Sequence, residues 1–132
     1  MRYEYALDLQ KIAEDVCDKM FPHVKKDRIK CFRSYGSSTK RTIARCHALG
    51  KLMQKAMAVD AFYALEFLMP IFEKQNKDDQ IKTIIHELMH IPKTFGGGFR
   101  QHDFVCNENV DLIYNKYMEL KINEKAKNNF KL

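Results

Sequence analysis

The chain has 132 residues, of which 45% are hydrophobic and 30% charged, and its net charge is +6. This length and composition indicate one soluble globular domain over residues 1–132 and leave too little chain for a two-lobed architecture. The N-terminus lacks the apolar stretch of a signal peptide, and Glu66 and Pro70 interrupt the most apolar run, Ala61–Phe72. These features exclude a membrane span, so we expect a cytoplasmic protein that does not contact a membrane.

The four cysteines have no paired spacing of the kind that binds a structural zinc ion or forms a redox motif. They stand at Cys17, Cys31, Cys46 and Cys106. In a reducing compartment, cysteines at such spacings are usually free thiols. We therefore expect neither disulfides nor a second metal site.

Residues 5–20 are the first predicted element, an amphipathic helix. Its apolar residues recur at helical spacing, namely Leu9, Ile12, Ala13, Val16 and Met20. Such a stripe usually packs into the core of a domain. The pair Phe21-Pro22 ends the pattern.

Two short segments, residues 28–35 and 40–47, are rich in β-branched and aromatic residues and flank Gly36-Ser37-Ser38-Thr39. This pattern predicts a β-hairpin. The surrounding stretch from Pro22 to Lys55 holds ten Lys or Arg and one acid, Asp27, so the positive charge is local. One interpretation is a surface for nucleic acid or an acidic substrate, and the other is a solvated hairpin face that protects a sheet edge.

Residues 49–58 fit either a short helix or an irregular crossing. The next segment, residues 62–68, alternates in the manner of a strand, with Tyr63, Leu65 and Phe67 on one face. We expect Glu66, on the other face, to point into water.

The following segment contains His86-Glu87-Leu88-Met89-His90, an HExxH pattern on a predicted helix. At helical spacing the two histidines project about 40° apart, and Glu87 lies about 60° from His90. Apolar residues occupy the opposite face, at Ile81, Ile84, Leu88 and Ile91. Asn76 or Asp78 is placed to cap the start of this helix, and Pro92 stops it. The spacing therefore places two ligands of one metal and a possible general base on a helix that packs into the core.

The third ligand is expected to be His102, which follows the flexible run Gly96-Gly97-Gly98. Three protein ligands leave a position for water, as in catalytic zinc sites. Glu108, Asp103 and Cys106 are alternatives. If His102 is the ligand, Asp103 is better placed to orient a histidine.

The last predicted helix contains Val110, Ile113, Tyr114 and Tyr117, with Asn107 as a possible cap. Tyr114, Tyr117 and Arg100 are candidates to stabilise an oxyanion. Residues 123–132 are rich in Lys and Asn, and we expect them to fray.

The phrase His-Glu-Leu-Met-His-Ile-Pro, followed by the glycine run and His102, resembles the zincin metallopeptidases, in particular the archaeal and phage metallopeptidases and the SprT-like proteins. The resemblance covers His86, Glu87, His90 and His102, and extends more loosely over residues 28–104. SprT-like proteins usually carry His-Gly-x-x-Phe after a longer spacer, whereas this chain has His102-Asp103-Phe104. The resemblance implies that residues 62–68 form the strand at the edge of the active-site cleft, where a peptide substrate adds to the sheet.

The predicted fold is therefore α+β and zincin-like: a small mixed or antiparallel sheet packed against the HExxH helix, with N- and C-terminal helices. The predicted activity is hydrolysis of peptide bonds, with Zn²⁺ held by His86, His90 and His102 and with Glu87 activating the bound water. The alternative is a SprT-like protein that binds DNA through residues 22–55 and cleaves only bound proteins, or none. A metal-stabilised scaffold is a weaker hypothesis, because structure alone does not require a carboxylate at Glu87.

Overall fold

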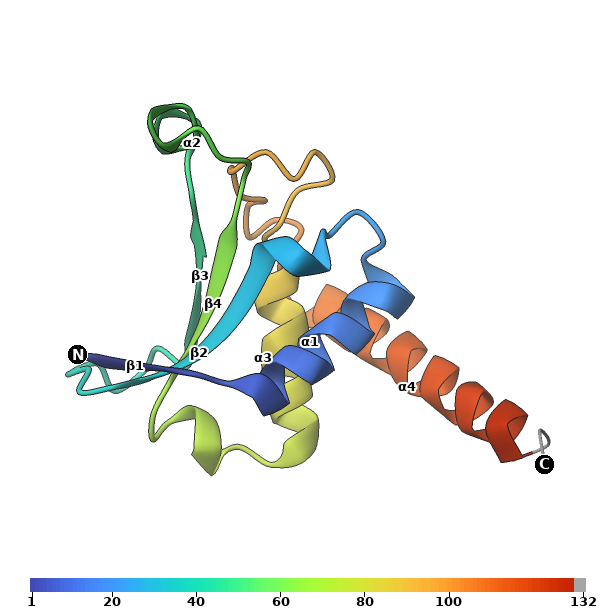
Figure 1. Cartoon of the computed structure of the whole chain (residues 1–132). Helices are drawn as coiled ribbons and strands as arrows, with labels where there is room; N and C mark the ends of the chain where they lie inside the picture. Colours follow the sequence, from blue (N-terminus) through green and yellow to red (C-terminus); the bar gives the residue numbers. More distant parts are fainter. Residues whose placement is uncertain (130–132) are drawn as a thin grey trace.

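A mixed four-stranded sheet carries three helices on one face in the computed structural model, which describes residues 1–129 (Figure 1). The strands lie in the order β1-β2-β4-β3. In chain order, the elements are β1 (Arg2–Tyr5), α1 (Leu7–Met20), β2 (Ile29–Tyr35), β3 (Ala44–Ala48), α2 (Lys51–Met57), β4 (Tyr63–Leu68), α3 (Lys77–Met89) and α4 (Asn107–Asn129). Single 3-10 turns precede β2 and α3. The architecture is α+β, with a small mixed sheet and four helices.

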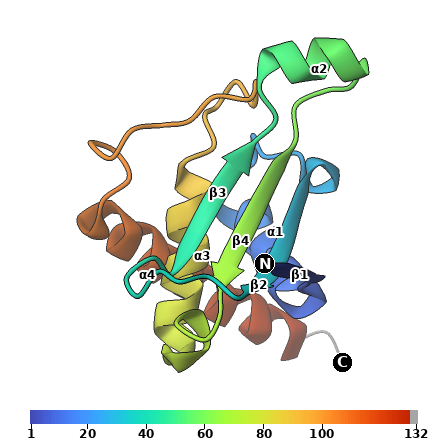
Figure 2. The ribbon, with the colours of Figure 1, turned by 90° about the vertical axis from the view of Figure 1, so that its left-hand side faces the viewer.

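The predicted β-hairpin is wrong, although both of its strands exist. β2 and β3 do not pair with each other, because β4 lies between them, parallel to β2 and antiparallel to β3 (Figure 2). β4 is the most apolar of the strands and has five of its six residues buried, so its place at the centre of the sheet removes the most apolar surface from water. The same pairing corrects the prediction that residues 62–68 form the strand at the edge of the active-site cleft where a peptide adds, because β4 already has a strand on each side. The strand next to α3 is β3 (Figure 2).

Glu66 is the residue of β4 for which the sequence prediction is wrong. It is 4% exposed and does not face bulk water. Its carboxylate lies 2.7 Å from Nε2 of His47 and 3.8 Å from the Arg45 guanidinium, both on the neighbouring strand. Burial tends to raise the pKa of Glu66, but the Ser34 hydroxyl, His47 and Arg45 together hold it below its ordinary value.

The core lies between the sheet and helices α1, α3 and α4. Its largest fully buried side chains include Tyr63, Phe67, Phe72, Ile84, Leu88 and Tyr117. The buried side chain of Gln10 joins α1 to β2, because its amide donates to the carbonyl of Ile29 and accepts from the backbone N–H of Cys31. The predicted helix at 5–20 is thus confirmed from Leu7 onward, whereas β1 and its pairing with β2 were not predicted.

α4 extends past residue 123, from which we expect the chain to fray. The helix continues to Asn129, and the remainder of the expected tail lies outside the described residues. An ion pair of 2.8 Å between Lys19 on α1 and Glu124 fixes the helix beyond its buried part. None of the helices within residues 1–129 combines the length and apolar character that crossing a bilayer requires. The four cysteines are free, as predicted.

Candidate metal centre

Helix α3 carries the HExxH residues against the sheet. It begins after Asn76, whose side-chain oxygen accepts the backbone N–H of Asp79 at 2.8 Å and so caps the first turn. Ile81, Ile84, Ile85 and Leu88 are buried on one side of the helix. His90 is the C-terminal capping residue, so the chain leaves the helix directly at the second histidine.

Three histidines converge where α3 ends. One ring nitrogen from each of His86, His90 and His102 lies within 4.8 Å of those of the other two. The ring centroids are 5.2 Å apart for His86 and His90 and 5.0 Å apart for His90 and His102. His86 and His90 are half-buried and His102 is exposed, so the cluster is open to solvent on one side. Within residues 1–129, no other group of histidine, cysteine or acidic side chains has this metal-binding arrangement.

The surroundings of His90 determine which of its nitrogens is free. Its Nδ1 lies 3.1 Å from the carbonyl oxygen of Arg100. A carbonyl can only accept a hydrogen bond, so Nδ1 carries the proton and Nε2 keeps its lone pair. Burial and neighbouring imidazoles lower the pKa values of His86 and His90, which favours the neutral form that binds a metal.

Glu87 is buried beside the histidines and is 5% exposed. Burial raises the pKa of this carboxyl group to about 7. A carboxylate whose pKa lies near neutrality can both accept and return a proton at physiological pH. A cation bound to the histidines would lower this pKa, because it would favour the charged form.

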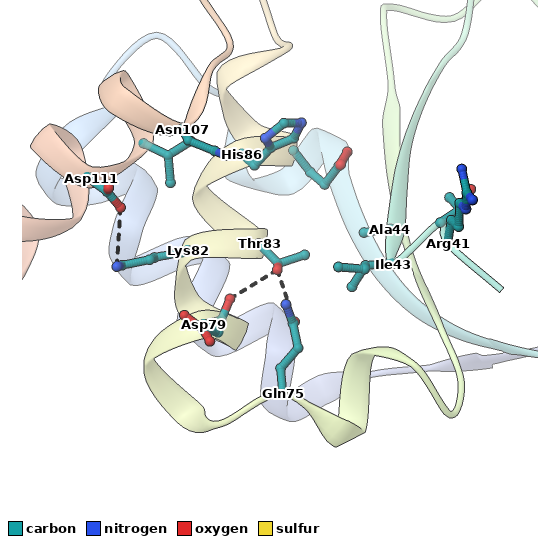
Figure 3. Close-up of a pocket in the computed structure, with 13 residues that line it drawn as sticks. Arg41, Ile43, Ala44, Gln75, Asp79, Lys82, Thr83, His86, Asn107 and Asp111 are labelled. Atoms are coloured by element: carbon teal, nitrogen blue, oxygen red, sulfur yellow. Dashed lines mark hydrogen bonds and ion pairs between the residues drawn. The ribbon is translucent and has the colours of Figure 1, made fainter.

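His86 and Glu87 lie at one end of a cleft of about 540 Å³ between α3, the start of α4 and the chain that leads into β3 (Figure 3). Thr83 and Gln75 line its lower part, with their side chains hydrogen-bonded to each other at 3.0 Å. Arg41 and the ion pair of Lys82 with Asp111 add charged groups of both signs at its border. Asn107, the first residue of α4, lines the same cleft as His86 (Figure 3). No local pattern indicates that Arg41 and Asn107 share a cleft with His86, because their proximity depends on the packing of β3 and α4.

The run Gly96-Gly97-Gly98 of the glycine loop, residues 95–102, is tied to the rest of the fold by the side chains of Tyr63 and Gln54. The hydroxyl of Tyr63, on β4, donates to the carbonyl of Gly98 at 2.8 Å and accepts the N–H of Gly97 at 2.9 Å. The amide of Gln54, on α2, donates to the carbonyl of Gly96 at 3.0 Å. Gly97 has a φ of +101°, and a Cβ there would lie 2.5 Å from Nε2 of Gln54 and 2.6 Å from the Leu49 carbonyl. The loop that carries His102 is therefore held in one conformation.

Several predicted site residues lie elsewhere. The Tyr114 hydroxyl donates to Asp78 and the Tyr117 hydroxyl to Asp15, so neither is available as an oxyanion donor. The Arg100 guanidinium stacks on the ring of Phe104 at 3.4 Å and lines a different cavity, together with Phe21 and His23.

The alternative ligands also fall outside the cluster. Asp103 accepts the backbone N–H of Phe104, and no histidine is among its hydrogen-bond partners in the described chain. Neither Glu108 nor Cys106 belongs to the group of three histidines. His23 is an ordinary polar histidine, whose Nε2 lies 3.1 Å from the Ile91 carbonyl.

The basic stretch from Pro22 to Lys55 does not form one surface. Lys26 pairs with Asp18, and Arg33 pairs with Asp8 and Glu73. Arg33 pairs with Phe67 of β4, and Arg45 pairs with Glu66 of the same strand. Because Glu66 and Phe67 are consecutive, the two arginines point to opposite faces of the sheet. The structure therefore gives no support to the nucleic-acid alternative.

Comparison with known proteins gives one match. The sequence model of the family described as "Putative phage metallopeptidase" matches residues 1–122, which include all three histidines and Glu87. No curated protein and no solved structure matches the chain.

Proposed function

The chain belongs to the phage metallopeptidase family, and from this membership we propose that it is a zinc-dependent peptidase whose centre is formed by His86, His90, His102 and Glu87. The observation that carries the proposal is the convergence of three imidazole nitrogens within 4.8 Å, with one buried carboxylate beside them. Peptide or protein chains are the substrates that this family implies.

The residues present fit a zinc ion. Neutral imidazole is a preferred zinc ligand, and the lowered pKa values of His86 and His90 favour that neutral form. The hydrogen bond from Nδ1 of His90 to the Arg100 carbonyl leaves Nε2 free to coordinate. When bound, zinc would supply Lewis acidity, which lowers the pKa of water and polarises a carbonyl oxygen.

Glu87 is the proposed general base and then general acid. It accepts a proton from the water that attacks the scissile carbonyl and returns it to the amine that leaves. Asn107 is the proposed donor to the developing oxyanion, because its side chain can donate a hydrogen bond and lines the same cleft as His86 and Glu87 (Figure 3).

The free edge of β3 is the proposed position of the substrate backbone. β3 is an edge strand, and Ala44 at its start lines the cleft together with His86 and Glu87. An extended peptide that pairs with β3 would run past these two residues. β3 thus takes the role that the sequence suggested for residues 62–68, which lie inside the sheet.

Two kinds of substitution test the proposed mechanism. Glu87→Gln keeps the shape of the side chain but removes its proton-accepting oxygen, so it should retain zinc and lose hydrolysis of an unfolded protein substrate by at least about 100-fold. His90→Ala should lose both zinc and hydrolysis, and His102→Ala should lower the zinc content measured by elemental analysis. Full activity of Glu87→Gln, or unchanged zinc in both histidine variants, would refute the assignment.

A further inference from the structure

Four of the first seven residues expose large hydrophobic side chains to water. β1 is at the edge of the sheet farthest from β3, and all four of its residues are exposed (Figure 2). Tyr3 is 59% exposed and Tyr5 is 72% exposed. Met1 and Leu7, on either side of the strand, are exposed as well. The two tyrosines therefore place exposed aromatic rings beside the unpaired backbone groups of an edge strand, where another chain can pair.

The backbone groups at this edge have a defined pattern. In the antiparallel ladder with β2, the N–H of Ala6 donates to the carbonyl of Cys31. Because backbone groups point alternately toward and away from a neighbouring strand, Glu4 and Arg2 also direct theirs toward β2. Tyr3 and Tyr5 therefore direct their N–H and C=O groups to the free side.

We propose that β1 is a homodimerisation strand, which pairs antiparallel with β1 of a second copy of this chain about a twofold axis at Tyr3. In this register Tyr3 exchanges two backbone hydrogen bonds with Tyr3 of the second copy. Tyr5 lies opposite Met1 of the second copy, and an apolar pair of this type stabilises a sheet.

The charges of β1 favour a second copy of this chain as the partner and favour this register over those centred on Arg2 or Glu4. Arg2 and Glu4 lie on one face of the strand, and their side chains are 3.3 Å apart and mostly exposed. With the axis at Tyr3, Arg2 of each copy is opposite Glu4 of the other. With the axis at Glu4 or Arg2, like charges would be directly opposite each other, which destabilises a strand pair. The strand is thus complementary to itself in charge when the axis lies at Tyr3.

The dimer would form a continuous eight-stranded sheet and leave both candidate metal centres accessible. Each centre lies beside β3, at the opposite edge of the sheet from β1. Because β1 has only four residues, we expect an association that dissociates on dilution.

Sedimentation velocity of the full chain over a micromolar to millimolar concentration series tests the proposal. The wild type should shift toward twice its own mass as concentration rises. Arg2→Glu should remain monomeric, because it places two carboxylates opposite each other, one from the substituted position and one from Glu4 of the second copy. The double substitution Arg2→Glu with Glu4→Arg should restore the dimer.

A backbone variant tests the same surface without a change of charge. Tyr3→Pro removes the outward N–H without removing a hydrogen bond to β2, and proline is tolerated at such edge positions. It should abolish dimerisation, whereas Tyr3→Val, which retains the N–H, should weaken it less. Far-ultraviolet circular dichroism should show that each variant is folded. A monomeric wild type at all concentrations, a dimer that persists in Arg2→Glu or Tyr3→Pro, or a double substitution that stays monomeric would each overturn the proposal.

Discussion

Tyr63→Phe is the substitution that most directly tests how the fold holds the third histidine. The ring of Tyr63 is fully buried against Phe95, with centroids 5.0 Å apart, and phenylalanine would keep this packing. The change removes only the hydroxyl, which makes two hydrogen bonds to the backbone of Gly97 and Gly98. We therefore expect the domain to fold while the glycine loop loses its hydrogen bonds to Tyr63 and keeps those to Gln54 and His90.

The magnitude follows from these two hydrogen bonds. Each contributes about 1 kcal/mol net, so the ordered loop should lose about 2 kcal/mol relative to its open states. If zinc requires the ordered loop to bring His102 to His86 and His90, the zinc dissociation constant should rise by up to about 30-fold. Part of the loss would appear instead as lower stability of the metal-free protein.

Competition titration with a chromogenic zinc chelator measures the affinity, and hydrogen–deuterium exchange of residues 95–102 reports the order of the loop. Tyr114→Phe is the matched control, because it also removes one tyrosine hydroxyl, but one that donates to Asp78 at 2.7 Å, at the other end of α3. It should leave both measurements unchanged. Faster exchange in Tyr63→Phe with unaltered zinc affinity would show that the loop conformation does not determine the position of His102, and this would refute the reasoning.

Three further predictions concern the loop, the cleft and the thiols. Gly97→Ala should lower the thermal midpoint by several degrees, because Gly97 has a φ of +101° and Gln54 and Leu49 lie too close to admit a Cβ. Gly98→Ala is the control and should change the midpoint little, because no atom lies within 4 Å of a Cβ there. If the amide of Asn107 stabilises the oxyanion, Asn107→Ala should lower kcat by about 100-fold with KM nearly unchanged. Asp111→Ala is the control, and an equal loss of kcat in this variant would show that any change in the cleft lowers activity. Burial raises the pKa values of Cys17 and Cys31 to about 12, so both thiols should resist iodoacetamide at pH 8. The partly exposed Cys106 should react. Mass spectrometry should therefore count fewer adducts on the folded protein than on the protein in denaturant.

The sequence predicts α1, α3, α4 and three of the four strands because their signals are local, whereas it left α2 undecided. α3 follows from apolar residues at helical spacing, an asparagine cap and Pro92, all within one segment. α1 follows from the same periodicity. β4 also follows from its alternation, and its bounds are within one residue of the prediction.

Strand pairing could not be predicted because it depends on residues far apart in the chain. Two strands joined by Gly36-Ser37-Ser38-Thr39 look like a hairpin, and no local feature shows that a later strand separates them. β1 gives no signal of burial, since all four of its residues are exposed. Glu66 interrupts an apolar strand and so resembles a solvent-facing residue, but it is buried, and its carboxylate lies against Arg45 and His47 of the adjacent strand.

The loop between His90 and His102 shows where the predictive power of the motif ends. Helical periodicity brings His86 and His90 together, but eleven residues of a glycine-rich loop could place His102 almost anywhere nearby. The fold removes this freedom at Arg100, whose N–H donates to the His90 carbonyl at 2.7 Å and whose carbonyl accepts from Nδ1 of the same histidine. These two hydrogen bonds fix the backbone two residues before His102. The residue pair His90 and Arg100 therefore sets both the tautomer of His90 and the starting point of the segment that carries His102. Tyr63 and Gln54 then hold the part of the loop that Arg100 does not reach. The geometry of the three histidines therefore depends on α2 and β4 as much as on the helix that contains the motif.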